Sequence, residues 1–218
     1  MSNEELVSRT AAFVKDKFKD ESSGHDWWHI YRVWQLAKRI AAKEKGANIL
    51  VVELGALLHD IADFKFHGND LEAGPKAARV WLAKAGADDQ VILAVEDIVR
   101  NVSFKGAKIE NKFKSIDGQI VHDADKLDAI GAIGIARVFA YSGFNGNLIH
   151  DPDRKVLDFK TFEEYANYKS TSINHFYEKL LLLKDRMLTK TGNQMAARRH
   201  EYMENYLKEF YTEWDGKL

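Results

Sequence analysis

The sequence predicts an all-α protein, built as a single-domain helical bundle over residues 1–218. Apolar residues recur at every third or fourth position along most of the chain, which places them on one face of a helix. Only two prolines occur, Pro75 and Pro152, so long helices are permitted. Strand-like alternation of apolar and polar residues is not sustained over any long stretch. An active site is therefore expected between helices.

Five helices are expected in the N-terminal half of the chain. Gly46 and Gly86 mark the ends of the second and fourth, and Pro75 falls near the first turn of the fourth, where its missing N–H costs little. The residues that mark the five helices are, in order, Leu6, Phe13, Val14 and Phe18; Ile30, Val33, Leu36, Ala37 and Ile40; Leu50, Leu54, Leu57, Leu58 and Ile61; the stretch 70–84; and Val91, Ile92, Val95, Ile98 and Val99.

The C-terminal half alternates between helices and irregular stretches. A lysine-rich loop is expected first, and Ser115 caps the long helix that follows, which has a break within it. Gly131 and Gly134 lie three residues apart in that helix and would let a neighbouring helix pack closely. The loop, the irregular excursion and the two last helices are expected at 103–114, 142–160, 171–188 and 191–213.

The composition excludes several classes of function. The net charge is −1, from 32 basic and 33 acidic residues, so a strongly basic face and a stable nucleic-acid complex are not expected. The chain has no cysteine, which excludes disulfides and thiolate metal sites. The nitrogen and oxygen donors that remain suit Mg, Mn, Fe or Zn.

The segment 1–18 is amphipathic and lacks the continuous apolar run of a signal peptide. No window approaches 18 apolar residues, so no membrane span is expected. A cytoplasmic location follows as an expectation.

Three polar sites in apolar surroundings carry the predicted chemistry. His59 and Asp60 end an apolar helix, where burial without a partner would be costly. An isolated His-Asp pair is most often an ordinary helix end, but His29 lies thirty residues upstream on the preceding, antiparallel helix. Asp125 adds a carboxylate from a third helix. Two imidazoles and two carboxylates form a plausible shell for a divalent cation.

This pattern resembles the HD-domain metal-dependent phosphohydrolase superfamily. The matching residues are His29, followed three residues later by an Arg-Val pair, then His59 with Asp60, and finally Asp125. Three segments are similar to the bacterial stand-alone HD proteins that are thought to hydrolyse nucleotides: GHDWWHIYRVW, HDIAD and DADKLDAIGAIGIAR.

The resemblance covers most of the chain. Its motifs span residues 23–140 and it continues through SINHFYEKLLLLKDRM. It implies a single HD-type domain, in which helices of the 161–213 region pack on the motif-bearing core. It also implies one metal ion, bound by the two histidines and two aspartates named above.

One departure from the wider superfamily concerns the number of metal ions. HD phosphodiesterases and oxygenases with two metals carry further histidines on the helix after the HD motif, and the comparable segment here, EDIVRNVSF, has none. A mononuclear site is therefore favoured. His67 and His122 are spare histidines that leave a second metal open.

Two residues near the ligands are catalytic candidates. Asp63 lies four residues after His59 and three after Asp60, so it would share their helix face. In HD nucleotidases an acid at this spacing is implicated in catalysis, so Asp63 would orient a water or act as general acid or base; the alternative is a solvated helix-end residue. Arg32 lies one turn after His29 and would pair with a phosphate oxygen or with a nearby aspartate.

Three further residues are candidates for contact with substrate. Lys126 follows Asp125 and would neutralise phosphate charge, which makes it a third catalytic candidate. His25 would contact substrate or cap the start of its helix. Lys105 would meet substrate or remain a solvated loop lysine.

The predicted function is metal-assisted hydrolysis of a nucleotide. The resemblance favours a nucleoside triphosphate cleaved to monophosphate and pyrophosphate. The alternatives are a catalytically silent nucleotide-binding sensor, a nucleoside monophosphate phosphatase or phosphodiesterase, and a di-iron oxygenase. The expected cofactor is one Mn or Mg ion, with Co, Ni, Fe and Zn left open, and the chain is expected to be a monomer or homodimer.

Overall fold

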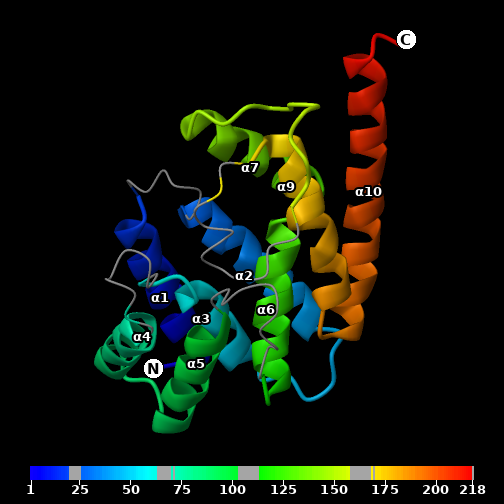
Figure 1. Ribbon diagram of the computed structural model, residues 1–218. Coiled ribbons are helices and arrows are strands. Elements are labelled where there is room, and N and C mark those ends of the chain that lie inside the picture. The colour runs from blue at the N-terminus through cyan, green and yellow to red at the C-terminus, as the bar shows by residue number, and fades with distance from the viewer. Residues whose placement is uncertain are drawn as a thin grey trace. The chain divides into compact units, whose positions relative to one another are not determined.

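The computed structural model describes residues 1–19, 26–62, 70, 72–102, 113–157, 168 and 170–217. All regular structure in these ranges is helical, which confirms the all-α prediction (Figure 1). The helices in chain order are α1 (Asn3–Lys17), α2 (Trp27–Ala41), α3 (Ile49–Leu58), α4 (Ala73–Ala85), α5 (Asp89–Val102), α6 (Ile116–Asp128), α7 (Gly131–Phe144), α9 (Ser172–Glu178), the 3-10 helix η2 (Leu180–Arg186) and α10 (Lys190–Trp214).

The chain forms two compact units. Among the described residues, the first unit comprises 1–102 and 113–125, and the second comprises the described residues from 126 to 217. The unit boundary falls within α6. The expectation of a single domain over 1–218 stays a prediction.

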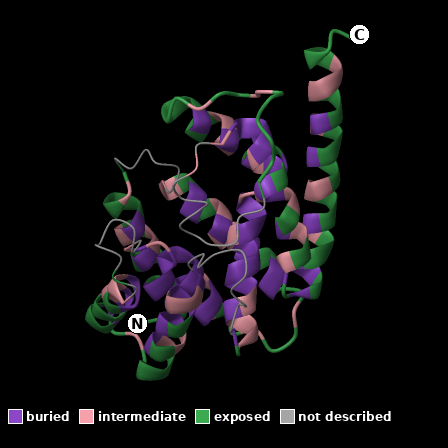
Figure 2. Cartoon of the chain, in the orientation of Figure 1, coloured by how far each residue is buried: buried purple, intermediate pink, exposed green. Residues whose placement is uncertain are grey.

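The first unit is organised around α3, which is apolar on almost every side. Leu54, Leu57 and Leu58 are fully buried, because α3 packs against α1, α2 and α5. A helix that is apolar all round is stable only in such an interior. Figure 2 shows the buried residues, in purple, inside this unit and exposed residues, in green, on the outer side of α4. The end of α3 therefore places His59 in the interior and Asp60 at its edge.

The α-helix ends one residue before the His-Asp pair. His59 is the C-cap residue of α3, with helical dihedral angles of −56° and −34°, and the N–H of Ile61 donates to the Leu58 carbonyl at 3.0 Å. Residues 59–62 therefore form a tight turn. Asp63, predicted to share the helix face of His59 and Asp60, lies outside the described residues, so that placement stays a prediction.

The second unit contains α7, α9, η2 and α10. α10 packs on α7 and η2, and α9 packs on both of these as well. The expected break in the long helix is found at residues 129–130, between α6 and α7. The expected helix at 171–188 is wrong as a single α-helix: Lys179, with φ of −144°, ends α9, and the chain continues as a 3-10 helix. The irregular stretch predicted at 142–160 begins later than expected, because α7 continues to Phe144; residues 145–157 form turns and bends without a regular element.

The two glycines of α7 have different neighbours. Gly131 has φ of +77°, and a Cβ there would lie 3.0 Å from Cγ of Arg199 on α10. Gly131 thus allows the close approach of a second helix that the sequence predicted. A Cβ on Gly134 would instead collide with the carbonyl group of Ala129, one of the two residues between α6 and α7.

Within the described residues, no single helix is both long enough and apolar enough to cross a membrane. The pair α6 and α7 passes that test by length and composition only when the two helices are counted together.

Gly131→Ala is expected to lower the free energy of unfolding by at least about 1–2 kcal/mol, the cost of the left-handed conformation for a residue with a Cβ. Gly143→Ala in the same helix is the matched control, because no atom lies within 4 Å of the added methyl group. That variant should be unchanged or more stable by up to about 1 kcal/mol. Urea unfolding followed by circular dichroism measures both, and equal effects would contradict the role given to Gly131.

Candidate metal centre

Three elements of the first unit bring the predicted ligands together. Asp26 caps α2 by accepting a hydrogen bond from the His29 N–H at 2.8 Å, which fixes His29 in the first turn. His59 and Asp60 directly follow the last residue of the buried α3. Asp125 lies in the last turn of α6. The side chains converge although 96 residues separate the first ligand from the last.

The donor atoms form one compact cluster. The Nε2 atoms of His29 and His59 are 3.3 Å apart. Oδ2 of Asp60 lies 3.5 Å from Nε2 of His29 and 3.3 Å from Nε2 of His59. Oδ1 of Asp125 lies 3.6 Å and 3.9 Å from the same two nitrogens. One ligand atom each from His29, His59 and Asp125 falls within a mutual distance of 4.8 Å.

These separations fit a divalent cation. Four ligands at about 2.0–2.2 Å from one ion are about 3.0–3.5 Å from one another, close to the nitrogen–nitrogen and shorter nitrogen–oxygen distances found. The set of two imidazole nitrogens and two carboxylate oxygens suits first-row divalent ions and excludes none of Mg, Mn, Fe, Co, Ni or Zn by donor type.

The other ring nitrogen of His59 is already committed. Nδ1 lies 2.8 Å from the carbonyl oxygen of Ala56, so it carries the proton and donates it there. Nε2 of a neutral His59 then presents its lone pair to the cluster, which is the usual arrangement of a metal-binding histidine. Both histidines are buried, at 2% and 3% exposed, and the side chains of Asp60 and Asp125 are more open. The cluster therefore meets solvent on its carboxylate side.

The electrostatic environment favours a cation. Burial alone would lower the pKa of His59, but the charge of Asp60, its hydrogen bond and the charge of Asp125 raise the pKa to about 9. The negative field that holds a proton in this cluster is the same field that would hold a metal ion, and the two compete for the same nitrogen.

The other predicted site residues fall in different places. Arg32 is half-buried on α2, one turn after His29. Lys126 is buried at 7% exposed and belongs to the second unit. Asp63, His25 and Lys105 lie outside the described residues, so their predicted roles stay predictions.

Of the two spare histidines, the structure describes only His122. His122 is buried on α6, with Nδ1 3.1 Å from Oδ1 of Asp123 and its ring 5.5 Å from that of Phe113. His67 lies outside the described residues. Among the described residues, His29, His59 and Asp125 form the one group of three or more histidine or acidic side chains whose ligand atoms lie close enough to hold a metal ion. The expectation of one ion per chain stays a prediction.

Two contributors to the centre were missed in the sequence. Asp26 directly precedes a helix and is a typical N-cap residue, so the sequence did contain a signal for it. The sequence contains no such signal for the Ala56 carbonyl. Which backbone oxygen accepts the hydrogen bond depends on the orientation of the His59 ring at the end of α3.

The fold and the cluster define an all-α protein with a candidate site for a divalent metal ion between its helices. The model of one family, the HD domain, matches residues 27–130, a range that contains all four of these side chains. YpgQ of Bacillus subtilis, an uncharacterized protein, is 35% identical over 212 residues, which are 94% of this chain and 91% of that protein. The chain therefore belongs to the HD-domain superfamily.

Solved structures agree with this assignment. An HD-superfamily hydrolase from Bacillus thuringiensis is 39% identical, with a TM-score of 0.77, covering 98% of this chain and 99% of the other. The structure of B. subtilis YpgQ in complex with ADP has a TM-score of 0.75 at 29% identity, covering 98% of this chain and 97% of that one. The predicted family is confirmed.

The wild-type protein is expected to bind one divalent ion per chain, and His59→Ala or Asp60→Ala should abolish that binding while the helical content stays near wild type. Loss of a residue that hydrogen-bonds to a metal ligand typically weakens metal binding by about 10–100-fold, so loss of a ligand itself should cost at least about a hundredfold. Calorimetric titration with Mn²⁺, with circular dichroism alongside, measures both properties.

His200→Gln is the matched control, since it removes a histidine on α10 whose Nε2 lies 3.2 Å from Glu204 in the same helix. It should bind Mn²⁺ as the wild type does. Full occupancy in the Asp60→Ala variant would remove Asp60 from the ligand set, and two ions per wild-type chain would show that the site is not mononuclear.

Proposed function

We propose that this protein hydrolyses a nucleotide at the cluster of His29, His59, Asp60 and Asp125, and that the substrate is a nucleoside triphosphate cleaved to monophosphate and pyrophosphate. The observation that carries the proposal is the cluster itself: two buried imidazoles and two partly exposed carboxylates that face one point and open to solvent. The ADP bound in the structure of the similar YpgQ supports a nucleotide as the ligand class.

Each side chain then has one task. The two histidines and two aspartates hold the ion, which when bound supplies Lewis acidity toward a phosphate oxygen and acidifies a water. Asp63 orients that water and takes its proton. Arg32 pairs with a phosphate oxygen through its guanidinium group.

The remaining candidates would act on substrate charge and position. Lys126 is covalently next to Asp125 and is proposed to neutralise phosphate charge that grows in the transition state. His25 and Lys105 are proposed as substrate contacts. These assignments rest on the sequence.

We infer a single Mn or Mg ion as the cofactor, because carboxylates provide half of the donors and phosphate substrates commonly bind through these ions. Co, Ni, Fe and Zn stay open. The expected states, a monomer or homodimer in the cytoplasm with no stable nucleic-acid complex and no membrane association, also stay predictions.

Purified protein is expected to release pyrophosphate from nucleoside triphosphates when Mn²⁺ or Mg²⁺ is added. The test incubates it with each of the metals Mn, Mg, Co, Ni and Fe and a panel of nucleotides, and assays phosphate and pyrophosphate separately. Asp60→Ala should lower the rate to background. Phosphate released from monophosphates would instead identify a phosphatase. Nucleotide binding without any product would identify a sensor, and oxidation chemistry with Fe an oxygenase.

Asp63→Asn is expected to keep metal occupancy and nucleotide affinity near wild type but to lower turnover at least about a hundredfold, since general acid–base roles contribute about 10²–10⁴-fold. The amide keeps the size of the side chain but cannot take up a proton at neutral pH. Arg32→Ala is the contrasting variant, because it should also raise KM through the loss of a charge-assisted contact with phosphate. A turnover near wild type in Asp63→Asn would make Asp63 a solvated residue.

A further inference from the structure

A hydrogen bond joins the starts of α3 and α6 in the first unit. Oδ1 of Asp117, in the first turn of α6, accepts a hydrogen bond from the N–H of Asn48 at 2.7 Å. Asn48 is the N-cap residue of α3, and its own side chain accepts a hydrogen bond from the N–H of Val51. The bond between Asp117 and Asn48 therefore fixes the start of one helix to the start of the other.

The ends of the same two helices carry candidate ligands. His59 is the C-cap residue of α3 and Asp60 follows it, whereas Asp125 lies in the last turn of α6. Both helices thus run in chain direction from the bond at their starts to the ligand cluster. There, Nε2 of His59 lies 3.9 Å from Oδ1 of Asp125. The two helices are therefore joined at their starts and meet again at the candidate metal centre.

A further contact between the two helices lies between these points. A Cβ on Gly55 of α3 would lie 3.4 Å from Cγ2 of Val121 on α6 and 3.1 Å from Cδ1 of Ile98 on α5. Gly55 precedes Ala56, whose carbonyl oxygen accepts the hydrogen bond from Nδ1 of His59. The approach of α6 to α3 is therefore close beside the backbone group that orients one of the ligands.

The start of α6 is coupled to Asp125 through the helix itself, because each turn is hydrogen-bonded to the next. Asp125 follows Asp117 by eight residues, which is about 12 Å along a helix axis. A tilt of about 5° over that length moves the far end by about 1 Å. Metal–ligand distances tolerate deviations of only about 0.2 Å. A small displacement at the start of α6 is therefore large at the metal centre.

The contact made by Asp117 depends on an acceptor oxygen more than on a negative charge. Burial raises the pKa of the half-buried Asp117 carboxyl above its usual value, although the hydrogen bond from the Asn48 N–H acts in the opposite direction. The charged form is therefore not favoured by its surroundings. An asparagine side chain has an oxygen that accepts the same hydrogen bond without the charge.

We propose that Asp117 is a positioning residue of the metal centre: its hydrogen bond to the N–H of Asn48 fixes α6 against α3 and so fixes Asp125 relative to the ligands at the end of α3. The inference rests on the metal site of the proposed function. It assigns an effect on metal affinity to a residue outside the ligand cluster, through contacts that all lie in the first unit.

The test compares wild type, Asp117→Ala and Asp117→Asn by calorimetric titration with Mn²⁺, by the visible spectrum of the Co²⁺-loaded protein and by the midpoint of urea unfolding. Asp117→Ala should weaken Mn²⁺ binding by about tenfold, the lower end of the loss of about 10–100-fold that follows removal of a group supporting a ligand. Its Co²⁺ spectrum should change, because Asp125 is displaced. Asp117→Asn should bind Mn²⁺ within about threefold of wild type, since the acceptor oxygen is kept.

Ser115→Ala is the matched control on the same helix. The Ser115 hydroxyl group accepts a hydrogen bond from the Gly118 N–H at 3.1 Å, so this variant weakens the start of α6 and leaves the bond between Asp117 and Asn48 in place. It should lower the unfolding midpoint, as the loss of an N-cap does. Its Mn²⁺ affinity and Co²⁺ spectrum should stay as in wild type.

Wild-type Mn²⁺ affinity in Asp117→Ala, or an equal loss in Ser115→Ala, would overturn the positioning role. An affinity in Asp117→Asn as low as in Asp117→Ala would also overturn it, because the charge and not the hydrogen bond would then be responsible. A wild-type protein that binds no divalent ion would refute the metal centre together with the inference. None of these readouts requires a nucleotide, so failure of the proposed hydrolysis and failure of this inference are distinguishable.

Discussion

The burial of two imidazole rings beside two carboxylates is the constraint on which the candidate site depends. An unsatisfied polar group in a protein interior is costly, and the cluster meets that cost in two ways. Nδ1 of His59 donates to the Ala56 carbonyl, and Nε2 of both histidines faces the aspartates at 3.3–3.9 Å. Such a concentration of negative charge requires a proton or a metal ion. In the proposed function a divalent metal ion, rather than a proton, occupies this cluster.

The fold provides this arrangement through one apolar helix. α3 has neighbours on several sides, so its orientation is determined by core packing and the turn after Leu58 emerges at a defined point. α2 brings its first turn to that point because Asp26 stops the helix from beginning elsewhere. The ligands are thus placed by the ends of rigid elements, which position side chains more accurately than long loops do.

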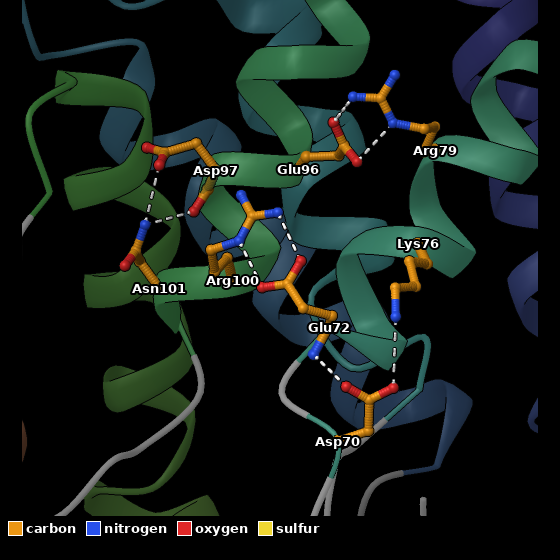
Figure 3. A network of polar contacts seen from close by, with 8 residues as sticks. All are labelled: Asp70, Glu72, Lys76, Arg79, Glu96, Asp97, Arg100 and Asn101. Carbon is orange, nitrogen blue, oxygen red and sulfur yellow. Dashed lines mark hydrogen bonds and ion pairs between the residues drawn. The ribbon is translucent and has the colours of Figure 1, made fainter.

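Two bidentate ion pairs join the region of α4 to α5 in the first unit: Arg100 with Glu72, and Arg79 with Glu96 (Figure 3). Paired contacts of this kind fix direction as well as distance, so they constrain how the start of α4 meets the end of α5. A Cβ on Gly74 would lie 3.3 Å from the carbonyl oxygen of Ala62, so the same helix start packs closely on the turn that contains His59 and Asp60.

The sequence by itself determined the all-α class, the approximate helices and the four candidate ligands. These depend on local features: apolar spacing, and polar residues in apolar surroundings. The tertiary structure decided where helices end and which distant groups meet. It ended α3 at Leu58, divided the 171–188 segment between an α-helix and a 3-10 helix, and turned His59 toward a backbone carbonyl. The pairing of Glu72 with Arg100, 28 residues apart, is likewise invisible in the sequence, because it depends on how two helices pack.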